Sequence, residues 1–339
     1  MTLEDSSRAS GSAPWIYNQF GSTTNIARHI ANPARIARIY QHHDNPLALT
    51  TRNTTMSTSN AMMKENWTPP NIALAACTLL MLLTSASTLF ASHGNNQSTA
   101  LMVLSTLSLV GIAVLHSVRH LGVRYALMYF AIIVVIELIF EQVNIWSAGK
   151  VFGELSYPDN YFGPKILDIP IAVPLAMCAI NWPTYVLVNI ILFRRVVVTS
   201  KNMGVIAAVF HCAILATLHT AWSYCAEPMA LANGILHRPT IGDNSGLTHW
   251  GVPWVEFRGW WLMTFLQFMV FSFVLARVFK LPAEKPFSPV LESAPLVMYG
   301  GIALLLLINP VNQDLAIGTV FTMLAYVSLG FFRAWQKSA

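Results

Sequence analysis

The sequence predicts an all-α integral membrane protein, a polytopic bundle of seven or eight transmembrane helices. Three observations lead to this fold class. Of the 339 residues, 55% are hydrophobic and only 10% are charged, whereas soluble domains carry about 25% charged residues. Long apolar runs follow one another from residue 66 onward. Lys and Arg gather in every second connection between these runs, as topology signals do.

The first 65 residues differ from the rest of the chain. They are rich in Ser, Thr, Asn, Arg and His and contain no apolar run long enough to cross a bilayer. We interpret residues 1–65 as a disordered leader, a transit peptide, or a stretch added by a start codon placed too early. Residues 66–339 are predicted to form one polytopic helical membrane domain, with a motif-bearing core over 120–275.

A transmembrane helix needs about 20 apolar residues. The fourth predicted span is long, and Pro170, Pro174 and Pro183 are expected to kink or break it. The seventh is short and ends at Asn309-Pro310, which leaves the count at seven or eight. The spans are expected near residues 70–91, 99–117, 123–143, 168–193, 203–222, 259–279, 295–309 and 315–333.

The charge pattern predicts the topology. Basic residues mark every second loop and the C-terminal end, which places both termini in the cytoplasm of a multi-pass membrane protein, in the inner membrane if the source is bacterial. Loops 144–167 and 223–258 then lie on the outer side. The net charge of +5 and pI of about 9.1 reflect these topology signals, so no nucleic-acid partner is expected. The four cysteines lack metal-type spacing, and neither a disulfide nor a metal site is expected.

Two carboxylates mark the outer half of the third span. Glu137 and Glu141 are four residues apart, so a helix presents both on one face, and Asn144 extends this face by one turn. An ionisable side chain in a span costs several kcal/mol unless it faces protein or water. The pair therefore points to a polar interior, although Glu137 could also serve only to hydrogen-bond a neighbouring helix.

The second group of polar residues lies in HCAILATLHTAWSYCAEP, residues 211–228. His211 and His219 share one helical face with Trp222 nearby, and Glu227-Pro228 is expected to end the helix. The HExxH metal pattern is absent. Each histidine by itself is best interpreted as a hydrogen-bonded interior residue, and their pairing with Glu227 favours an active-site role.

The third group is HWGVPWVEFRGWW, residues 249–261, where four tryptophans accompany Glu256 and Arg258. An aromatic belt at the membrane interface accounts for part of this pattern. It does not account for an acid among the rings. Aromatic faces stabilise cations, and an acid in an apolar pocket keeps its proton and can donate it. Acid and aromatics together favour chemistry that makes and holds a carbocation.

These three groups resemble the motifs of bacterial and archaeal carotenoid biosynthesis membrane proteins. FGELSY at 152–157, followed by LDIPIAVPLAMCAINWPTY at 167–185, is similar to that family's FG-x-Y-x-Y segment and Pro-rich span. TAWSYCAEP at 220–228 resembles its AWDLxxDP motif, and GVPWVEFRGWW at 251–261 resembles its GVPxxNFxGW motif. The motif positions are Glu141, Tyr157, Trp222, Glu227, Gly251, Pro253, Phe257, Gly259 and Trp260.

The chain departs from the family pattern at three motif positions. Ser223 replaces the first Asp of AWDL, Glu227 replaces the second, and Glu256 stands where the family has Asn. The family includes hydratases that add water to the terminal double bond of acyclic carotenoids. The altered acids leave open another isoprenoid substrate or another fate of the cation.

The resemblance implies an isoprenoid or carotenoid enzyme without a cofactor, acting on a lipophilic substrate within the bilayer. Glu227 or Glu141 would protonate a terminal alkene, and water would add to the tertiary cation. A membrane terpene cyclase using the same first step is the alternative, and a transporter or lipid-binding protein is a further one. The oligomeric state stays open. The predicted catalytic residues are Glu227, Glu141, Glu256, Glu137 and His219, and the predicted substrate-binding residues are Trp222, Tyr157, Trp254, Trp260, Phe257, Ser223, Asn144 and His211.

Overall fold

A computed structural model describes residues 68–91, 99–154, 156–157, 164–232, 248–275, 282, 285, 287–308 and 313–336. The predicted leader, residues 1–65, lies outside the described residues.

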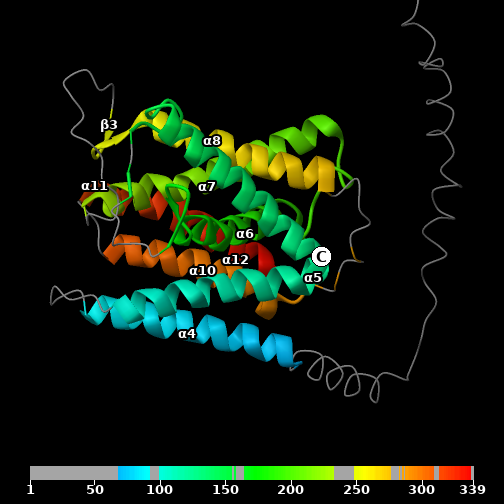
Figure 1. The fold of residues 1–339 in the computed structure, drawn as a ribbon. Helices are drawn as coiled ribbons and strands as arrows, with labels where there is room; N and C mark the ends of the chain where they lie inside the picture. The colour runs from blue at the N-terminus through cyan, green and yellow to red at the C-terminus, as the bar shows by residue number, and fades with distance from the viewer. Residues whose placement is uncertain are drawn as a thin grey trace, which may run out of the picture. The chain divides into compact units, whose positions relative to one another are not determined.

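The described chain is mainly helical (Figure 1). Two antiparallel hairpins precede helices α6 and α8, pairing β1 with β2 and β3 with β4. Two short π-helical segments, η2 and η3, continue α8 and α11. The elements are α4 (Pro69–Ala91), α5 (Thr99–Trp146), β1 (Lys165–Ile166), β2 (Ile169–Pro170), α6 (Ala172–Phe193), α7 (Val205–Ala232), β3 (Thr248–His249), β4 (Val252–Pro253), α8 (Trp254–Met269), η2 (Val270–Leu275), α10 (Pro289–Ile308), α11 (Gln313–Thr319), η3 (Val320–Leu324) and α12 (Ala325–Trp335).

Six helices of the described chain are long and apolar enough to cross a membrane, which makes this a multi-pass membrane protein. The shorter apolar stretch Pro69–Thr84 belongs to α4. The six are Leu104–Trp146, Ala172–Phe193, Val205–Ala232, Trp254–Val274, Pro289–Leu307 and Gln313–Trp335.

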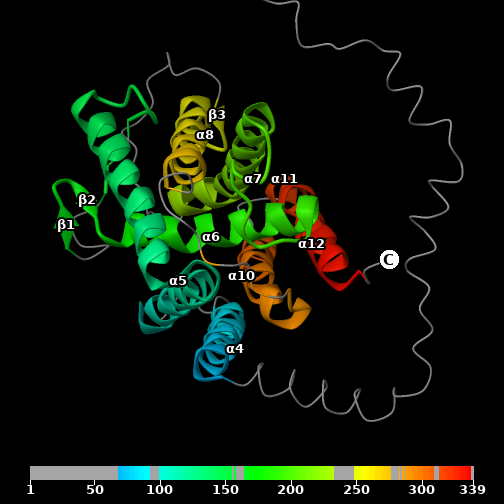
Figure 2. The same ribbon diagram turned by 90° about the vertical axis from the view of Figure 1, so that its right-hand side faces the viewer.

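Helix α5 consists of two halves joined at Gly122. Its 48 residues would measure about 72 Å as one straight helix, more than twice the ~30 Å hydrocarbon core. Gly122 interrupts the helical backbone with φ 73° and ψ 161°, a conformation that favours glycine. The first half runs along α4, and the second half leaves in another direction (Figures 1 and 2). The halves correspond to the predicted spans 99–117 and 123–143.

Helix α6 is the most buried of the six candidate spans. It contacts α5, α7, α10 and α12, and it passes between them in Figure 2. Its aromatic residues form part of the core: Trp182 stacks on Tyr185 with ring centroids 5.5 Å apart, and Tyr129 of α5 meets Trp182 edge-on at 5.3 Å. Such pairs contribute beyond their buried area.

Several predicted boundaries were wrong. The fourth span begins at Ala172 and not at 168, because Pro170 belongs to β2, while Pro183 is accommodated inside α6. The seventh span is not short: α10 begins at Pro289 and contains 20 residues. The helix expected to stop at Glu227-Pro228 continues to Ala232.

A hydrogen bond from the β3–β4 hairpin supports the continuation of α7 past Pro228. A proline inside a helix removes the hydrogen bond to the carbonyl four residues earlier, here that of Tyr224. His249 of β3 donates its Nε2–H to this carbonyl, with 3.2 Å between the nitrogen and the oxygen. The β3–β4 hairpin thereby supplies the donor that Pro228 lacks.

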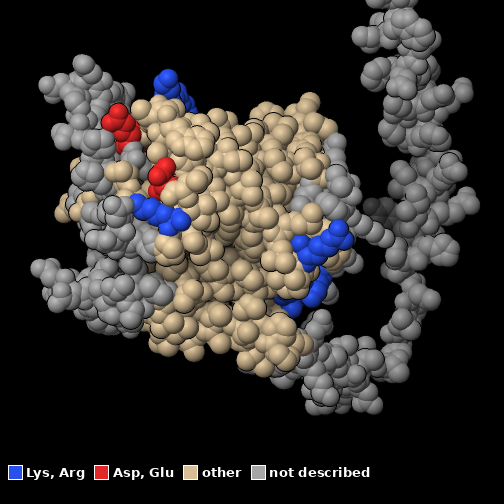
Figure 3. All heavy atoms as spheres, in the orientation of Figure 1, with Lys and Arg blue, Asp and Glu red and all other residues tan. Residues whose placement is uncertain are grey.

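On the face shown in Figure 3, the charged residues lie away from the middle of the described surface. On the face that Figure 3 shows, Lys and Arg lie toward both ends, whereas Asp and Glu lie toward one end. The broad described surface between them carries none of these residue types. This distribution fits a belt of surface that contacts lipid.

Candidate active site

The second half of α5 carries the predicted polar face. Glu137, Glu141 and Asn144 are all fully buried. Glu137 lies beside Gln267 of α8 and interacts electrostatically with Glu141 and with Glu227 of α7. The structure therefore brings three predicted carboxylates from two helices together. We call Glu137, Glu141 and Glu227 the carboxylate cluster.

Tyr157 covers this cluster from the loop that follows α5. Its hydroxyl donates to Oε1 of Glu141 at 3.1 Å, and Nζ of Lys165 donates to its backbone carbonyl at 3.1 Å. Burial raises the pKa of Tyr157 well above 10.0, and the nearby Glu141, Glu227 and Glu137 raise this pKa further. The hydroxyl therefore stays protonated and available as a donor at neutral pH.

Asn144 holds the loop that leads to Tyr157. Its Oδ1 accepts hydrogen bonds from the backbone N–H groups of Val151 and Phe152, at 3.0 and 2.7 Å, and its Nδ2 donates to the carbonyl of Gly153 at 3.0 Å. These three bonds fold the start of the FGELSY segment back onto α5. Asn144 thus contacts the loop that leads to the site.

Helix α7 presents a buried polar stripe at four-residue spacing. His219, Ser223 and Glu227 fall on one face and are all buried. Within the described chain, both ring nitrogens of His219, Oγ of Ser223 and Nε1 of Trp222 have no hydrogen-bond partner. The ring of Trp222 lies 6.3 Å from that of His219. A buried polar atom left unbonded costs about 1–3 kcal/mol, so this stripe is suited to bind a water or a polar part of a substrate.

The FGELSY segment and the GVPWVEFRGWW motif pack against each other. Gly259 of α8 lies so close to Phe152 that a Cβ atom at position 259 would overlap the ring and would lie 2.7 Å from the carbonyl oxygen of Val151. Trp260 is buried, with its ring 5.3 Å from that of Phe152. Glu256 is also buried and accepts a hydrogen bond from Nε1 of Trp260 at 3.4 Å.

A separate aromatic group lies at the β3–β4 hairpin. Phe257 stacks on Tyr224 at 4.2 Å, and Trp254 meets Tyr224 edge-on at 5.2 Å while remaining 44% exposed. His249 completes the group, and burial lowers its pKa, so its ring is neutral at pH 7. Trp254 and Phe257 therefore belong to this hairpin group.

His211 lies sixteen residues before Glu227 on α7, which is about 24 Å along a helix. Its Nε2 is 2.7 Å from Oδ1 of Asn189. This matches the hydrogen-bonded interior histidine expected for each histidine of the pair. His219 does not match this expectation in the described chain, since neither ring nitrogen has a partner.

Sequence reasoning missed a second buried polar group. His116 and His120 of α5 both lie close to Oε2 of Glu292 on α10, at 2.7 and 2.8 Å from their Nε2 atoms. The available signal was the spacing of four residues in HSVRH, which places both histidines on one helical face.

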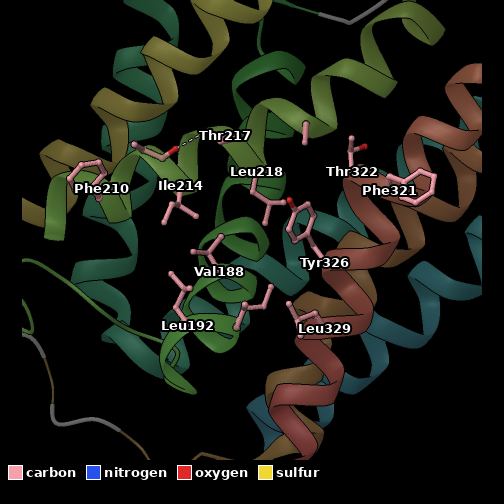
Figure 4. A pocket seen from close by; sticks show the side chains of 13 residues that line it. Val188, Leu192, Phe210, Ile214, Thr217, Leu218, Phe321, Thr322, Tyr326 and Leu329 are labelled. Carbon is pink, nitrogen blue, oxygen red and sulfur yellow. Dashed lines mark hydrogen bonds between the residues drawn. The ribbon is translucent and has the colours of Figure 1, made fainter.

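An apolar groove of 550 Å³ opens between α6, α7 and the η3–α12 segment. Figure 4 shows side chains from all three directed at the hollow, among them Val188, Ile214 and Tyr326. The residues of α7 that line it lie on a different face from His219, Ser223 and Glu227. The groove is therefore separate from the carboxylate cluster.

The comparisons agree with the motif evidence. The profile of the carotenoid biosynthesis protein family matches residues 97–329. This match is wider than the resemblance over 120–275 and takes in helices on both sides of it. No curated protein and no solved structure matches the chain. Because the profile covers well over half of the sequence, this chain belongs to the carotenoid biosynthesis protein family.

Proposed function

We propose that this protein is a hydratase that protonates the terminal double bond of an acyclic carotenoid or related isoprenoid and adds water to the tertiary cation. The observation that carries this proposal is the carboxylate cluster with Tyr157 above it, buried inside a membrane protein of the carotenoid biosynthesis family. Three carboxylates in one buried place favour sharing protons over carrying three charges, because water does not screen their repulsion there.

The first step transfers the carboxylic acid proton of Glu227 to the less substituted alkene carbon. The π electrons form the new C–H bond, a tertiary cation remains on the neighbouring carbon, and Glu227 becomes a carboxylate. General acid catalysis contributes typically 10²–10⁴-fold. The negative carboxylates and the faces of Trp222 and Trp260 stabilise the cation.

The second step adds water to the cation. A water bound between His219, Ser223 and the carboxylate cluster donates its oxygen lone pair to the cation. Glu141 or Glu137 accepts the proton that the water loses. The product is a tertiary alcohol, and proton transfer within the carboxylate cluster restores the acid on Glu227. His219 and Ser223 favour hydration over cyclisation, since their unbonded polar atoms can hold the water.

We further propose eight spans, with both termini in the cytoplasm and the carboxylate cluster toward the outer side. Dividing α5 at Gly122 and counting α4 as a span gives eight segments. The acids on the face in Figure 3 lie toward one end only, and the opposite end carries only basic residues, which supports a cytoplasmic assignment for that end.

The test is expression in a host that makes acyclic carotenoids, followed by product masses. The variants are Glu227→Gln and Glu141→Gln, and Glu154→Gln is the matched control because Glu154 is exposed on the nearby loop. We expect the wild type and the control to yield products heavier by one water, with a loss of 10²-fold or more for Glu227→Gln.

A new product of unchanged mass would identify a cyclase, which overturns hydration. An unchanged carotenoid profile with the protein present in the membrane would remove this substrate class and favour the transporter or lipid-binding alternative. Full activity of Glu227→Gln would reject Glu227 as the acid.

A further inference from the structure

The proposed reaction leaves the second buried polar group unused. His116 and His120 lie one turn apart on the first half of α5, and Glu292 comes from α10, far away in the sequence. All three side chains are buried, and the two imidazole ring centroids are 4.8 Å apart. We call these three residues the His–His–Glu cluster.

The residue types are those of a two-histidine, one-carboxylate metal centre, a ligand set typical of iron. One possible ligand atom from each residue lies within 4.8 Å of the other two. A histidine binds a metal through a nitrogen lone pair, and its other nitrogen normally carries a proton that it donates to a neighbour. The protonation of His116 therefore decides whether the cluster can hold a metal.

Trp182 of α6 determines that protonation. Its Nε1 is 3.1 Å from Nδ1 of His116. An indole N–H can only donate, so Nδ1 must be the acceptor and cannot carry a proton. The proton of the neutral ring is then on Nε2, which faces Oε2 of Glu292 at 2.7 Å. In this tautomer Nε2 has no lone pair to offer a metal.

We propose that Trp182 holds His116 as its Nε2–H tautomer and thereby makes the His–His–Glu cluster a hydrogen-bonded clamp that is closed to metal ions. The two distances to Oε2 of Glu292 are those of hydrogen bonds to a charged acceptor. Without the Trp182 N–H, the His116 proton can move to Nδ1, and the same three residues become a divalent transition-metal site.

The clamp has a defined place in the fold. Trp182 holds the first half of α5 through His116, and its neighbour Asn181 accepts a hydrogen bond at 2.7 Å from the hydroxyl of Tyr129 in the second half. Two adjacent residues of α6 thus hold α5 on both sides of the break at Gly122. Glu292 adds α10 to the same junction.

Cobalt(II) binding to the purified full-length protein in detergent tests the proposal. We expect no cobalt at this cluster in the wild type or in Trp335→Phe, a control at an exposed tryptophan. Trp182→Phe should bind about one ion per chain, visible in the d–d absorption, and the added Glu292→Gln change should abolish it. Cobalt bound by the wild type and lost in His116→Ala would overturn the proposal, as would a folded Trp182→Phe that binds none.

A second measurement does not depend on the folding of Trp182→Phe. Long-range ¹H–¹⁵N spectra of the wild type, labelled at histidine, report which nitrogen of each ring is protonated, and His116→Gln identifies the His116 signals. We expect a protonated Nε2 and an unprotonated Nδ1. A protonated Nδ1 on His116 would overturn the proposal.

Discussion

His249 donates its Nε2–H to the carbonyl of Tyr224, the carbonyl that Pro228 leaves without a helical donor. One residue of the third motif thus supports the helix that carries the second motif. Tyr224 lies three residues before Glu227 on α7, so this bond is made in the turn that carries Glu227. The β3–β4 hairpin therefore supports the helical turn that holds the predicted acid, Glu227.

This relationship predicts that substitutions at His249 and Pro228 are energetically coupled. His249→Ala should lower the free energy of unfolding by about 1 kcal/mol, because the carbonyl of Tyr224 loses its donor. In Pro228→Ala the residue at 228 supplies a helical N–H, so adding His249→Ala should cost much less. Chemical unfolding of the four proteins measures the difference. Equal costs in both backgrounds would show that the bond does not compensate for Pro228.

The packing of Gly259 on Phe152 predicts that position 259 does not tolerate a side chain larger than hydrogen. Gly259→Ala should destabilise the protein by about 1–3 kcal/mol, because the new methyl group overlaps the ring and the Val151 carbonyl. Gly318→Ala is the matched control, since a Cβ there meets nothing within 4 Å and alanine favours a helix. Thermal unfolding in detergent compares the two. A Gly259→Ala variant as stable as the control would mean that the two motifs do not pack closely.

The loop attachment by Asn144 predicts graded losses. Asn144→Ala removes the acceptor for two backbone N–H groups and should cost about 2–3 kcal/mol. Asn144→Asp keeps that acceptor, and at a pH low enough to protonate the carboxyl group its O–H replaces the donor to Gly153, so its cost there should be smaller. Under that condition the free energy of unfolding should be lower for Asn144→Ala than for Asn144→Asp, and proteolysis within residues 147–157 should be faster for Asn144→Ala. The reverse ranking would contradict this role.

The raised pKa of Tyr157 predicts a loss of stability at alkaline pH. In the unfolded chain the pKa of tyrosine is about 10, and in the folded protein it is well above this value. Below about pH 10 both states keep the proton. At higher pH the unfolded state releases it first, so the free energy of unfolding falls as the pH rises.

Comparing the wild type with Tyr157→Phe between about pH 9 and pH 11 isolates this effect. The stability advantage of the wild type over the variant should shrink across that interval. A constant difference would show that Tyr157 titrates alike in both states.

The residue pattern alone was enough to predict a helical membrane protein of the carotenoid biosynthesis family. Apolar runs of span length identify membrane helices, because every backbone polar group must be bonded within the segment in lipid. The shared face of Glu137, Glu141 and Asn144 followed from helical spacing, and the three motifs carried the family resemblance.

The tertiary structure decided which of these residues meet. Spacing along one helix says nothing about the helix that packs against it, so Glu227 could be placed with Glu137 and Glu141 only through the packing of distant segments. The same holds for the His–His–Glu cluster, because each of its histidines lies more than 170 residues before Glu292. The continuation of α7 past Pro228 likewise depends on a donor from a distant hairpin, because a buried carbonyl needs a partner that its own helix no longer provides.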